Sequence, residues 1–489
     1  MKILMVTPEV APFVKVGGLA DMVGSLAKAL SSRGHEVRVV CPLYGSVQRL
    51  GAWEAHEFPL SVHLGWGHEA FAQPWEVALD GEKTQYVFIE YDKYYHRDEV
   101  YEGPWGEHGD NAERFAFLSR AALDYCHKTG WMPDVVHAHD WPCGLVPVYL
   151  NTRDHHTPLG KAASVFTVHN LQHQGIFGKE LIDFAGLPHD VFRPDGLEAM
   201  GNVNMMKGGI YHATKITAVS PTYAQEIQTP EHGHGLNHVL HFRSADLIGV
   251  VNGIDTDVWS PERDALLPKT YSARDFSGKA ACKQALQQQV GLAEDAHVAV
   301  FGVVARLYWQ KGIDLLANII ARLLENMHIQ LVILGTGDQH LEHQLLELSY
   351  RYPGRLAVHI GYDNALAHLI EAGSDFFVMP SRFEPCGLNQ MYSMTYGTPP
   401  IARATGGLLD TIMQYDEHLK TGTGFLFDDS TEEALYYAMG WACSTYYDRP
   451  EDYKSLRVKG MTQDFSWAHS ATTYESVYDW AVASRKGRP

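Results

Sequence analysis

The chain has 489 residues, too many for one ordinary hydrophobic core, so at least two domains are expected. Its formal net charge of −19 argues against nucleic acid or an anionic membrane as the main partner. No apolar run approaches the ~20 residues of a membrane span. The six cysteines are scattered without a C-x-x-C pair, which indicates neither a disulfide framework nor a zinc site and favours a cytoplasmic location.

The first half of the chain alternates short apolar runs with amphipathic segments, the pattern of a doubly wound α/β domain. A strand at 2–6 leads through a loop to a helix whose apolar face runs from Leu19 to Leu30. Further strands are predicted at residues 36–40, 135–138, 163–168, 216–219 and 248–251. Residues 51–130 are less regular and rich in aromatic side chains, which indicates either ordinary packing or stacking on sugars.

A polar, irregular stretch at 259 to about 283 precedes a second alternating series. Its strands are predicted at residues 298–304, 330–334, 356–360, 375–380, 400–402 and 425–427. The sequence therefore predicts two Rossmann-like parallel-sheet domains that face each other, residues 1–251 and 252–464. An amphipathic segment at 470–482 follows.

The segment 381–388, Ser-Arg-Phe-Glu-Pro-Cys-Gly-Leu, connects a predicted strand to a helix predicted at 389–396. Such turns lie at the carboxyl edge of a parallel sheet, where open α/β proteins bind ligands. The amides of Cys386, Gly387 and Leu388 would point out of the helix start, beside the carboxylate of Glu384. This arrangement suits a polyhydroxylated ligand; the alternative is that Glu384 only caps its helix.

Three other loops suit anions. Lys15 precedes two glycines and a helix, so that backbone amides and the helix dipole could hold a phosphate. Arg306 and Lys311 share one strand-to-helix loop and would suit a diphosphate, unless they are ordinary surface charges. The third loop, Thr405 with Gly406 and Gly407, could hold a phosphate or a sugar hydroxyl, or be a plain turn.

Signals for a metal are weak, and no metal or cofactor is expected. A loose histidine cluster lacks the cysteine or acid that would complete a site; its members are His232, His234, His238 and His241. The sequence Asp255-Thr256-Asp257 looks like a metal-binding D-x-D, but it lies at the expected crossover between domains. A lone histidine at a strand end, such as His169, is more often structural than catalytic.

Taken together, these motifs resemble those of bacterial glycogen synthases, the ADP-glucose-using branch of the starch and glycogen synthase family. The matching segments run in family order over nearly the whole chain: 15–21, 137–141, 166–170, 219–223, 252–255, 306–307 with 310–312, 381–388, 405–408 and 464–467. The resemblance implies two domains of the GT-B type closing over a cleft, with a C-terminal helix at 465–489 that returns to the first domain. It also implies retaining transfer of glucose from ADP-glucose to the non-reducing end of glycogen or a malto-oligosaccharide.

The resemblance further implies roles for individual residues. Those holding the diphosphate would be Lys15, Gly18, Arg306 and Lys311. Tyr362 would stack on adenine, Asp21 would lie near the donor, and His169 and Asn252 would contact the sugar near its 6-position. Glu384, with the amides of Cys386 and Gly387, would hold glucose hydroxyls, while Asp140 belongs to a family motif without an assigned role. Stacking on the glucan acceptor is expected from Tyr94, Tyr95 and Trp141.

Three positions depart from the family pattern. Val16 stands where the family usually has threonine, and Asn389 where it often has threonine. Tyr392 occupies a position at which many relatives carry a second glutamate. Three alternative functions are a dinucleotide-dependent dehydrogenase, a glucan phosphorylase and a polysaccharide-binding protein without activity. The dehydrogenase is disfavoured because the sequence has no G-x-G-x-x-G motif.

Overall fold

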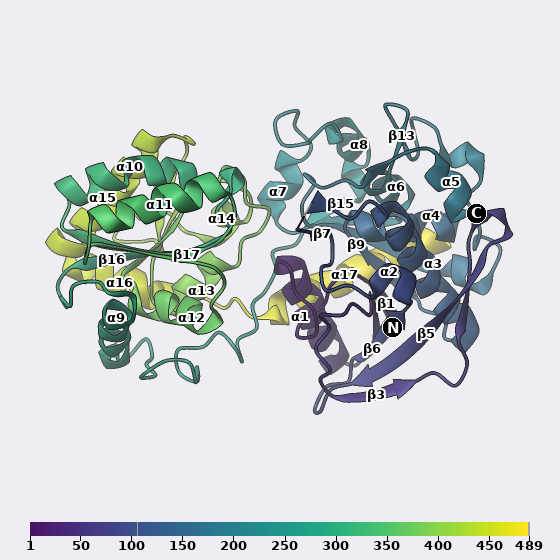
Figure 1. The fold of residues 1–489 in the computed structure, drawn as a ribbon, viewed down its shortest axis with the longest axis horizontal. Coiled ribbons are helices and arrows are strands. Elements are labelled where there is room, and N and C mark those ends of the chain that lie inside the picture. The colour runs from purple at the N-terminus through teal and green to yellow at the C-terminus, as the bar shows by residue number, and fades with distance from the viewer. Residues whose placement is uncertain (105, 488–489) are drawn as a thin grey trace. The chain divides into compact units, whose positions relative to one another are not determined.

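The computed structural model describes residues 1–104 and 106–487. By internal packing the chain forms two compact units (Figure 1). Unit 1 comprises Met1–Gly253 together with the chain from Trp467 onward, and unit 2 is Ile254–Ser466. Both are α/β units, as the sequence predicts, built on a mainly parallel sheet in unit 1 and a fully parallel sheet in unit 2.

Unit 1 is organised around one large sheet with the order β15-β14-β10-β9-β1-β2-β6-β5-β3, and β4 pairs with β5. Its parallel strands are β1 (Lys2–Val6), β2 (Glu36–Pro42), β6 (Gln85–Glu90), β9 (Val135–His139), β10 (Ala163–Val168), β14 (Lys215–Ala218) and β15 (Leu247–Gly249). Residues 3–6 are fully buried, as expected for a strand covered by helices on both faces.

The segment 51–130 is more regular than the sequence indicates. It adds the antiparallel strands β3 (Ala52–Ala55), β4 (Leu60–His63) and β5 (Glu69–Ala78) to the edge of the sheet, and it ends in the long helix α3 (Asn111–Thr129). These edge strands mix buried with exposed residues, so they lack the continuous apolar runs that reveal a central strand.

The other helices of unit 1 are α1 (Gly18–Ser32), α2 (Asp92–Tyr95), α4 (Leu145–Asn151), α5 (Glu180–Ala185), α6 (Met205–His212), α7 (Pro221–Glu226), α8 (Asn237–Phe242) and α17 (Trp467–Lys486). Of these, α1, α4, α7 and α17 pack against strands of the sheet. Helix α17, the last of the chain, packs against α1 and β10 (Figure 1). Its Glu475 accepts two hydrogen bonds from Arg33, at 2.7 and 2.9 Å. Small sheets form from β7 (Glu102–Gly103) with β8 (Gly106–Glu107), and from β11 (Ile176–Phe177), β12 (Glu198–Ala199) and β13 (Asn202–Asn204).

Unit 2 has a fully parallel sheet with the order β18-β17-β16-β19-β20-β21. Its strands are β16 (Ala299–Val304), β17 (Ile329–Gly335), β18 (Leu356–Ile360), β19 (Phe376–Met379), β20 (Pro400–Arg403) and β21 (Phe425–Phe427). Its helices are α9 (Ser277–Val290), α10 (Ile313–Asn326), α11 (Gln339–Arg351), α12 (Asn364–Gly373), α13 (Asn389–Thr395), α14 (Gly406–Thr411), α15 (Glu432–Asp448) and α16 (Pro450–Met461). Helix α9 begins earlier than the irregular stretch predicted at 259 to about 283 would allow.

The alternation of strand side chains divides the core of unit 2 in two. Phe301 and Val303 of β16 join the cluster under α10 and α15, whereas Val300 joins the cluster under α9 and α12. Figure 1 shows these helix pairs on opposite sides of the sheet. Both faces are therefore covered, which leaves the ends of the strands as the places where polar side chains can reach solvent.

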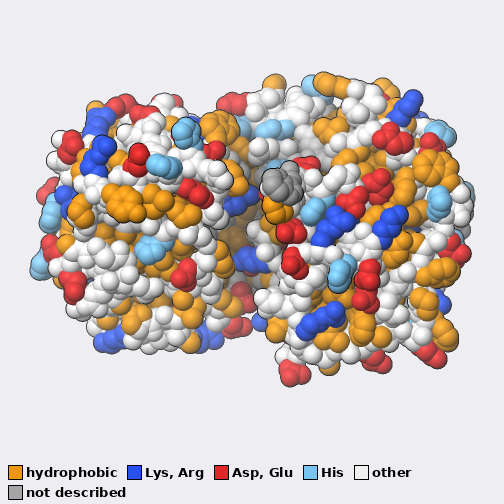
Figure 2. Space-filling view, viewed as in Figure 1, with side chains coloured by type: hydrophobic (Ala, Val, Ile, Leu, Met, Phe, Trp, Pro, Cys, Tyr) orange, Lys and Arg blue, Asp and Glu red, His pale blue; other side chains and the backbone are white. Residues whose placement is uncertain are grey.

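Acidic, basic and apolar side chains are interspersed over both units on the face drawn in Figure 2. In the described part of the chain, no helix is both long and apolar enough to cross a membrane.

Candidate functional site

The order of strands in unit 2 reverses between β16 and β19, which makes that point the topological switch of the sheet. Ligands of open α/β sheets bind beyond the carboxyl ends of the strands at such a point. The loop after β16 carries Arg306 and Lys311, and the loop after β19 carries Glu384. The residues expected to bind the diphosphate and those expected to bind glucose thus follow adjacent strands and lie at the same edge of the sheet.

Lys311 and Glu384 are in direct contact. The Lys311 Nζ atom lies 2.6 Å from Glu384 Oε2, and the Ser381 hydroxyl donates to the same oxygen at 3.0 Å. Glu384 is buried, while one fifth of the Lys311 side chain is exposed. A buried carboxylate is costly unless it is paired and hydrogen-bonded, and here both conditions are met. The helix-cap alternative fails, because the side chain turns to Lys311 and Ser381.

Arg382 fastens the loop after β19 to the loop after β16. Its guanidinium binds both carboxylate oxygens of Asp314, at 2.6 and 2.7 Å, and donates to the carbonyl of Trp309 at 2.7 Å. Sequence reasoning passed over this residue, because its partners lie about seventy positions earlier in the chain. A bidentate arginine pair of this kind fixes geometry as well as charge.

The turn at 405–407 packs on the backbone of the Glu384 loop. A Cβ on Gly406 would lie 2.0 Å from the Glu384 carbonyl oxygen, and one on Gly407 would lie 2.1 Å from that of Cys386. The Gly407 amide donates to the Glu384 carbonyl at 3.1 Å, and Thr405 is buried. These glycines are needed because two backbones meet, so the fold itself uses part of what the sequence suggested for a ligand.

The remaining expected residues of unit 2 differ in exposure. Tyr362, after β18, is 78% exposed, as a stacking platform requires, and Arg306 is also exposed. Cys386 is buried, Gly387 has a φ of +71° that favours glycine, and Leu388 immediately precedes α13. The two departures from the family pattern in unit 2 also find partners: Asn389 donates to the Val304 carbonyl at 2.7 Å, and the Tyr392 ring stacks on Trp259 at 3.7 Å between centroids.

In unit 1 the strand order reverses between β1 and β9. Asp140 follows β9 with a φ of +56°, a backbone conformation that few side chains adopt. Its carboxylate accepts from the amides of His169 at 2.7 Å and Asn170 at 3.5 Å. Burial raises the pKa of Asp140 to about 8 against the opposing effect of these two hydrogen bonds. Asp140 therefore holds the loop after β10 and is largely protonated near neutral pH.

His169 lies at that loop, 9% exposed, and burial lowers its pKa to about 3, so its imidazole is neutral. Its Nε2 is 3.1 Å from His139 Nδ1. Asn252, near the end of the first stretch of unit 1, is buried, and its side-chain oxygen has no hydrogen-bond partner among the described residues. A buried amide oxygen in that condition is a place where a ligand hydroxyl could donate.

The loop after β1 differs from the expectation. The amides of Val16 and Gly17 donate to Glu9 Oε2 at 2.5 and 3.0 Å, so they are engaged by the fold rather than left for a phosphate. Glu9 is buried and also accepts from the Tyr101 hydroxyl at 2.9 Å. Sequence reasoning missed Glu9. The exposed Lys15 forms an ion pair with Asp21 at 2.8 Å, and Gly18 begins α1.

The aromatic residues expected to stack on the glucan are buried, which is a correction. Tyr95 is fully buried and donates its hydroxyl to the Arg114 carbonyl at 2.7 Å, and Tyr94 is 4% exposed. Trp141 packs edge-on against Phe115, with centroids 5.0 Å apart. These rings are packed into the fold. The sequence does not reveal this, because an aromatic residue looks the same in sequence whether its ring packs inward or outward.

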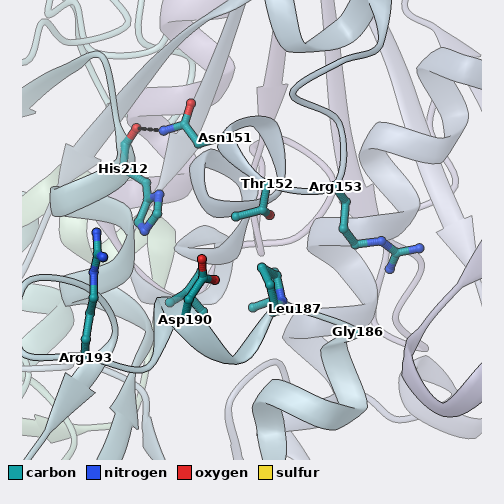
Figure 3. Close-up of a pocket in the computed structure, with 10 residues that line it drawn as sticks. Asn151, Thr152, Arg153, Gly186, Leu187, Asp190, Arg193 and His212 are labelled. Carbon is teal, nitrogen blue, oxygen red and sulfur yellow. Dashed lines mark hydrogen bonds between the residues drawn. The ribbon is translucent and has the colours of Figure 1, made fainter.

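A cavity of about 650 Å³ lies elsewhere in unit 1 (Figure 3). Two of its polar side chains serve the fold: Asn151 donates to the His212 carbonyl at 2.6 Å, and Arg153 turns away and donates to the His63 carbonyl at 2.8 Å. Within the described residues, no group of three or more His, Cys, Asp or Glu side chains is placed to hold a metal ion.

Comparison with known proteins connects this geometry to a family. Residues 2–242 match the family described as starch synthase catalytic domain, and residues 284–454 match the family described as glycosyl transferases group 1. The chain is 46% identical to glycogen synthase 1 of Geobacter sulfurreducens, covering 100% of this chain and 97% of that protein. It is 45% identical to the glycogen synthase of Myxococcus xanthus, covering 99% of this chain and 100% of that protein.

A solved structure of a starch synthase also matches this fold. The catalytic domain of starch synthase IV from Arabidopsis thaliana, bound to ADP and acarbose, superimposes with a TM-score of 0.92 at 35% identity. The match covers 98% of this chain and 99% of that one. Sequence similarity over the full length and a shared two-unit fold agree. The chain therefore belongs to the glycogen and starch synthase family of GT-B glycosyltransferases.

Proposed function

We propose that this chain is a glycogen synthase that transfers glucose from ADP-glucose to the non-reducing end of an α-1,4-glucan, with retention and release of ADP. The observation that carries the residue roles is the Lys311–Glu384 contact at the switch point of the unit 2 sheet. Support for the substrates comes from relatives named glycogen synthases and from a related structure that binds ADP and acarbose.

The contact between Lys311 and Glu384 suggests how ADP-glucose is bound. An ammonium group has three donors, and Glu384 engages one of them at 2.6 Å. The other two remain for phosphate oxygens, so one lysine could link the carboxylate that orients glucose to the departing diphosphate. Arg306 and Lys15 would add charge there, and one such donor typically contributes about 3–4 kcal/mol to transition-state stabilisation.

Retention is best explained by attack on the same face from which ADP leaves. The bond from C1 to the phosphate oxygen breaks, the bond from C1 to the acceptor oxygen forms, and the acceptor's proton passes to a β-phosphate oxygen. Glu384 is held by Lys311 and Ser381, and Asp140 is largely protonated, so neither is placed as a free carboxylate nucleophile. We assign Glu384 to orienting the sugar.

The other roles follow the family pattern. Tyr362 would stack on adenine, and the amides of Cys386, Gly387 and Leu388 would contact glucose hydroxyls. Thr405 and Gly406 would border the donor, and in unit 1 His169 and Asn252 would contact the sugar near its 6-position, with Gly18 and Asp21 near the donor. A cytoplasmic location is proposed as well, because all six cysteines are buried free thiols and the sequence has no C-x-x-C pair.

The proposal is tested by incorporation of labelled glucose into glycogen, with ADP-glucose and UDP-glucose compared side by side. We expect faster incorporation from ADP-glucose. In the same assay Glu384→Ala should lower turnover by about 100-fold or more, since an oriented transition-state contact is lost, with only modest loss of ADP affinity. Glucan binding without incorporation from either donor would instead favour a binding protein, and near-normal turnover of the variant would refute the role of Glu384.

A further inference from the structure

His169 does not stand alone at the end of β10. Its neighbour across the sheet is His139 at the end of β9, and the two strands are in parallel register with His139 opposite Thr167. His139 Nδ1 lies 3.1 Å from His169 Nε2, a hydrogen bond in which one ring donates and the other accepts. Both side chains are at least nine-tenths buried, so this bond is shielded from water.

The direction of this hydrogen bond follows from the second nitrogen of His139. Burial, with the nearby His137 and His169, lowers the pKa of His139 well below its ordinary value, so the ring is neutral and carries one N–H. Its Nε2 is buried and has no hydrogen-bond partner among the described residues. A buried N–H without an acceptor is rarer in folded proteins than an acceptor with an unused lone pair. The proton of His139 therefore belongs on Nδ1.

We infer that His139 is a positioning residue that locks His169 in the tautomer protonated at Nδ1. His139 donates from Nδ1, so His169 Nε2 must accept, and the single proton of the neutral His169 ring lies on its other nitrogen. The Nδ1–H of His169 is then available to donate a hydrogen bond to the oxygen of a glucose hydroxyl, and His169 would not accept one from that hydroxyl. The last step rests on the proposed contact between His169 and the donor sugar.

The array behind His139 keeps its ring in place. The His137 ring packs on it with centroids 4.1 Å apart. His137 is itself fixed by Thr167, 2.6 Å from Nε2, and by the Tyr478 hydroxyl of α17, 2.9 Å from Nδ1. His139 therefore has little freedom to rotate and exchange its two nitrogens. The last helix of the chain thus supports the orientation of a residue at the proposed sugar site.

The direct test is the ¹⁵N NMR spectrum of histidine-labelled protein, in which protonated and unprotonated ring nitrogens differ strongly in chemical shift. The His169 signals are identified by their loss in His169→Gln. We expect a protonated Nδ1 and an unprotonated Nε2 in the wild-type protein at neutral pH. The opposite pattern would overturn the inference, and this measurement needs no variant of His139.

Two substitutions of His139 separate its donor from its bulk. Asn places an amide N–H at the same number of bonds from Cα as Nδ1, whereas Leu fills the space without a donor. We expect His139→Leu to lose the single His169 tautomer and at least tenfold in kcat, with KM for glycogen changed less than threefold. His139→Asn should recover most of the single tautomer and most of kcat. As a control, His212→Leu removes an unconnected histidine of unit 1 and should leave the His169 tautomer and kcat unaltered.

The outcomes distinguish this inference from the proposed function. If His169 shows the expected tautomer but His169→Gln retains full glucose transfer, the sugar contact is wrong and the role of His139 in setting the tautomer stands. If His139→Asn and His139→Leu lose activity equally while both remain folded by circular dichroism and thermal melting, the donor of His139 is not what matters, and the positioning role fails.

Discussion

At the scale of single residues, the proposed sugar site depends on the contacts that hold Glu384 and its loop. Lys311 and Ser381 contact the Glu384 carboxylate directly. Arg382, two residues earlier in the same loop, binds both carboxylate oxygens of Asp314. The position of the carboxylate therefore depends on partners from two loops.

Arg382 offers the first test at this scale. Arg382→Ala should lower glucose transfer by about 10-fold or more, because the Glu384 loop loses its bidentate tie to Asp314. Arg382→Lys keeps the charge but not the planar fork, so it should recover only part of the rate. Steady-state kinetics with ADP-glucose and glycogen would show this, and a lysine variant with full activity would mean that charge alone suffices.

Asp140 provides a test through pH. Its pKa rises from 3.8 to about 8 because of burial, so between about pH 4 and 8 the unfolded chain releases a proton that the folded chain retains. Stability contributed by this group is complete below pH 4 and is lost as pH rises toward 8. The melting temperature of the wild type, relative to Asp140→Asn, should therefore fall over this range. A difference that does not change with pH would show that Asp140 is ionised in the fold.

Sequence patterns predict the residues that carry the chemistry better than the contacts that support them. Glu384, Arg306 and Lys311 stand out in the sequence because cations and a carboxylate follow buried strands. Arg382 and Glu9 do not, because each acts through partners distant in sequence or through backbone amides. The expectation for Tyr95 is wrong for a related reason, since the exposure of its ring depends on the tertiary fold.

At the scale of elements, the central strands of both sheets were predictable because both of their faces are buried and their sequences are continuously apolar. The antiparallel strands at 52–78 were not, because they lie at a half-exposed edge. A further element-level feature was invisible in the sequence. The Trp259 ring is stacked between Tyr392 and His368, with centroids 3.7 and 3.9 Å away, which fixes the segment after Ile254 to α12 and α13.

This stack indicates that position 392 suits an aromatic ring. Tyr392→Phe preserves the stacked ring and should cost less stability than Tyr392→Glu, which buries an unpaired carboxylate against Trp259 and should cost about 3 kcal/mol or more. Thermal melting would compare the two. If both variants melted alike, stacking would not be what the position requires.

At the scale of the whole molecule, unit 1 needs both ends of the chain. Helix α17 follows all of unit 2 in sequence, yet Glu475 binds Arg33 and Tyr478 contacts His137. The family pattern implied such a returning helix, while local periodicity could indicate only that a helix forms. Each unit carries its candidate residues in loops that follow parallel strands, and several of these loops flank the point where the strand order reverses, as expected of doubly wound sheets.

The most direct measurement is the transfer of labelled glucose from ADP-glucose to glycogen by the purified chain, followed by digestion with a glucosidase specific for α-1,4 linkages. We expect the label to enter the polymer and to be released by that digestion, because transfer retains the configuration of the donor. Absence of transfer, or incorporated label that resists the α-specific enzyme, would contradict a retaining ADP-glucose-dependent glycogen synthase.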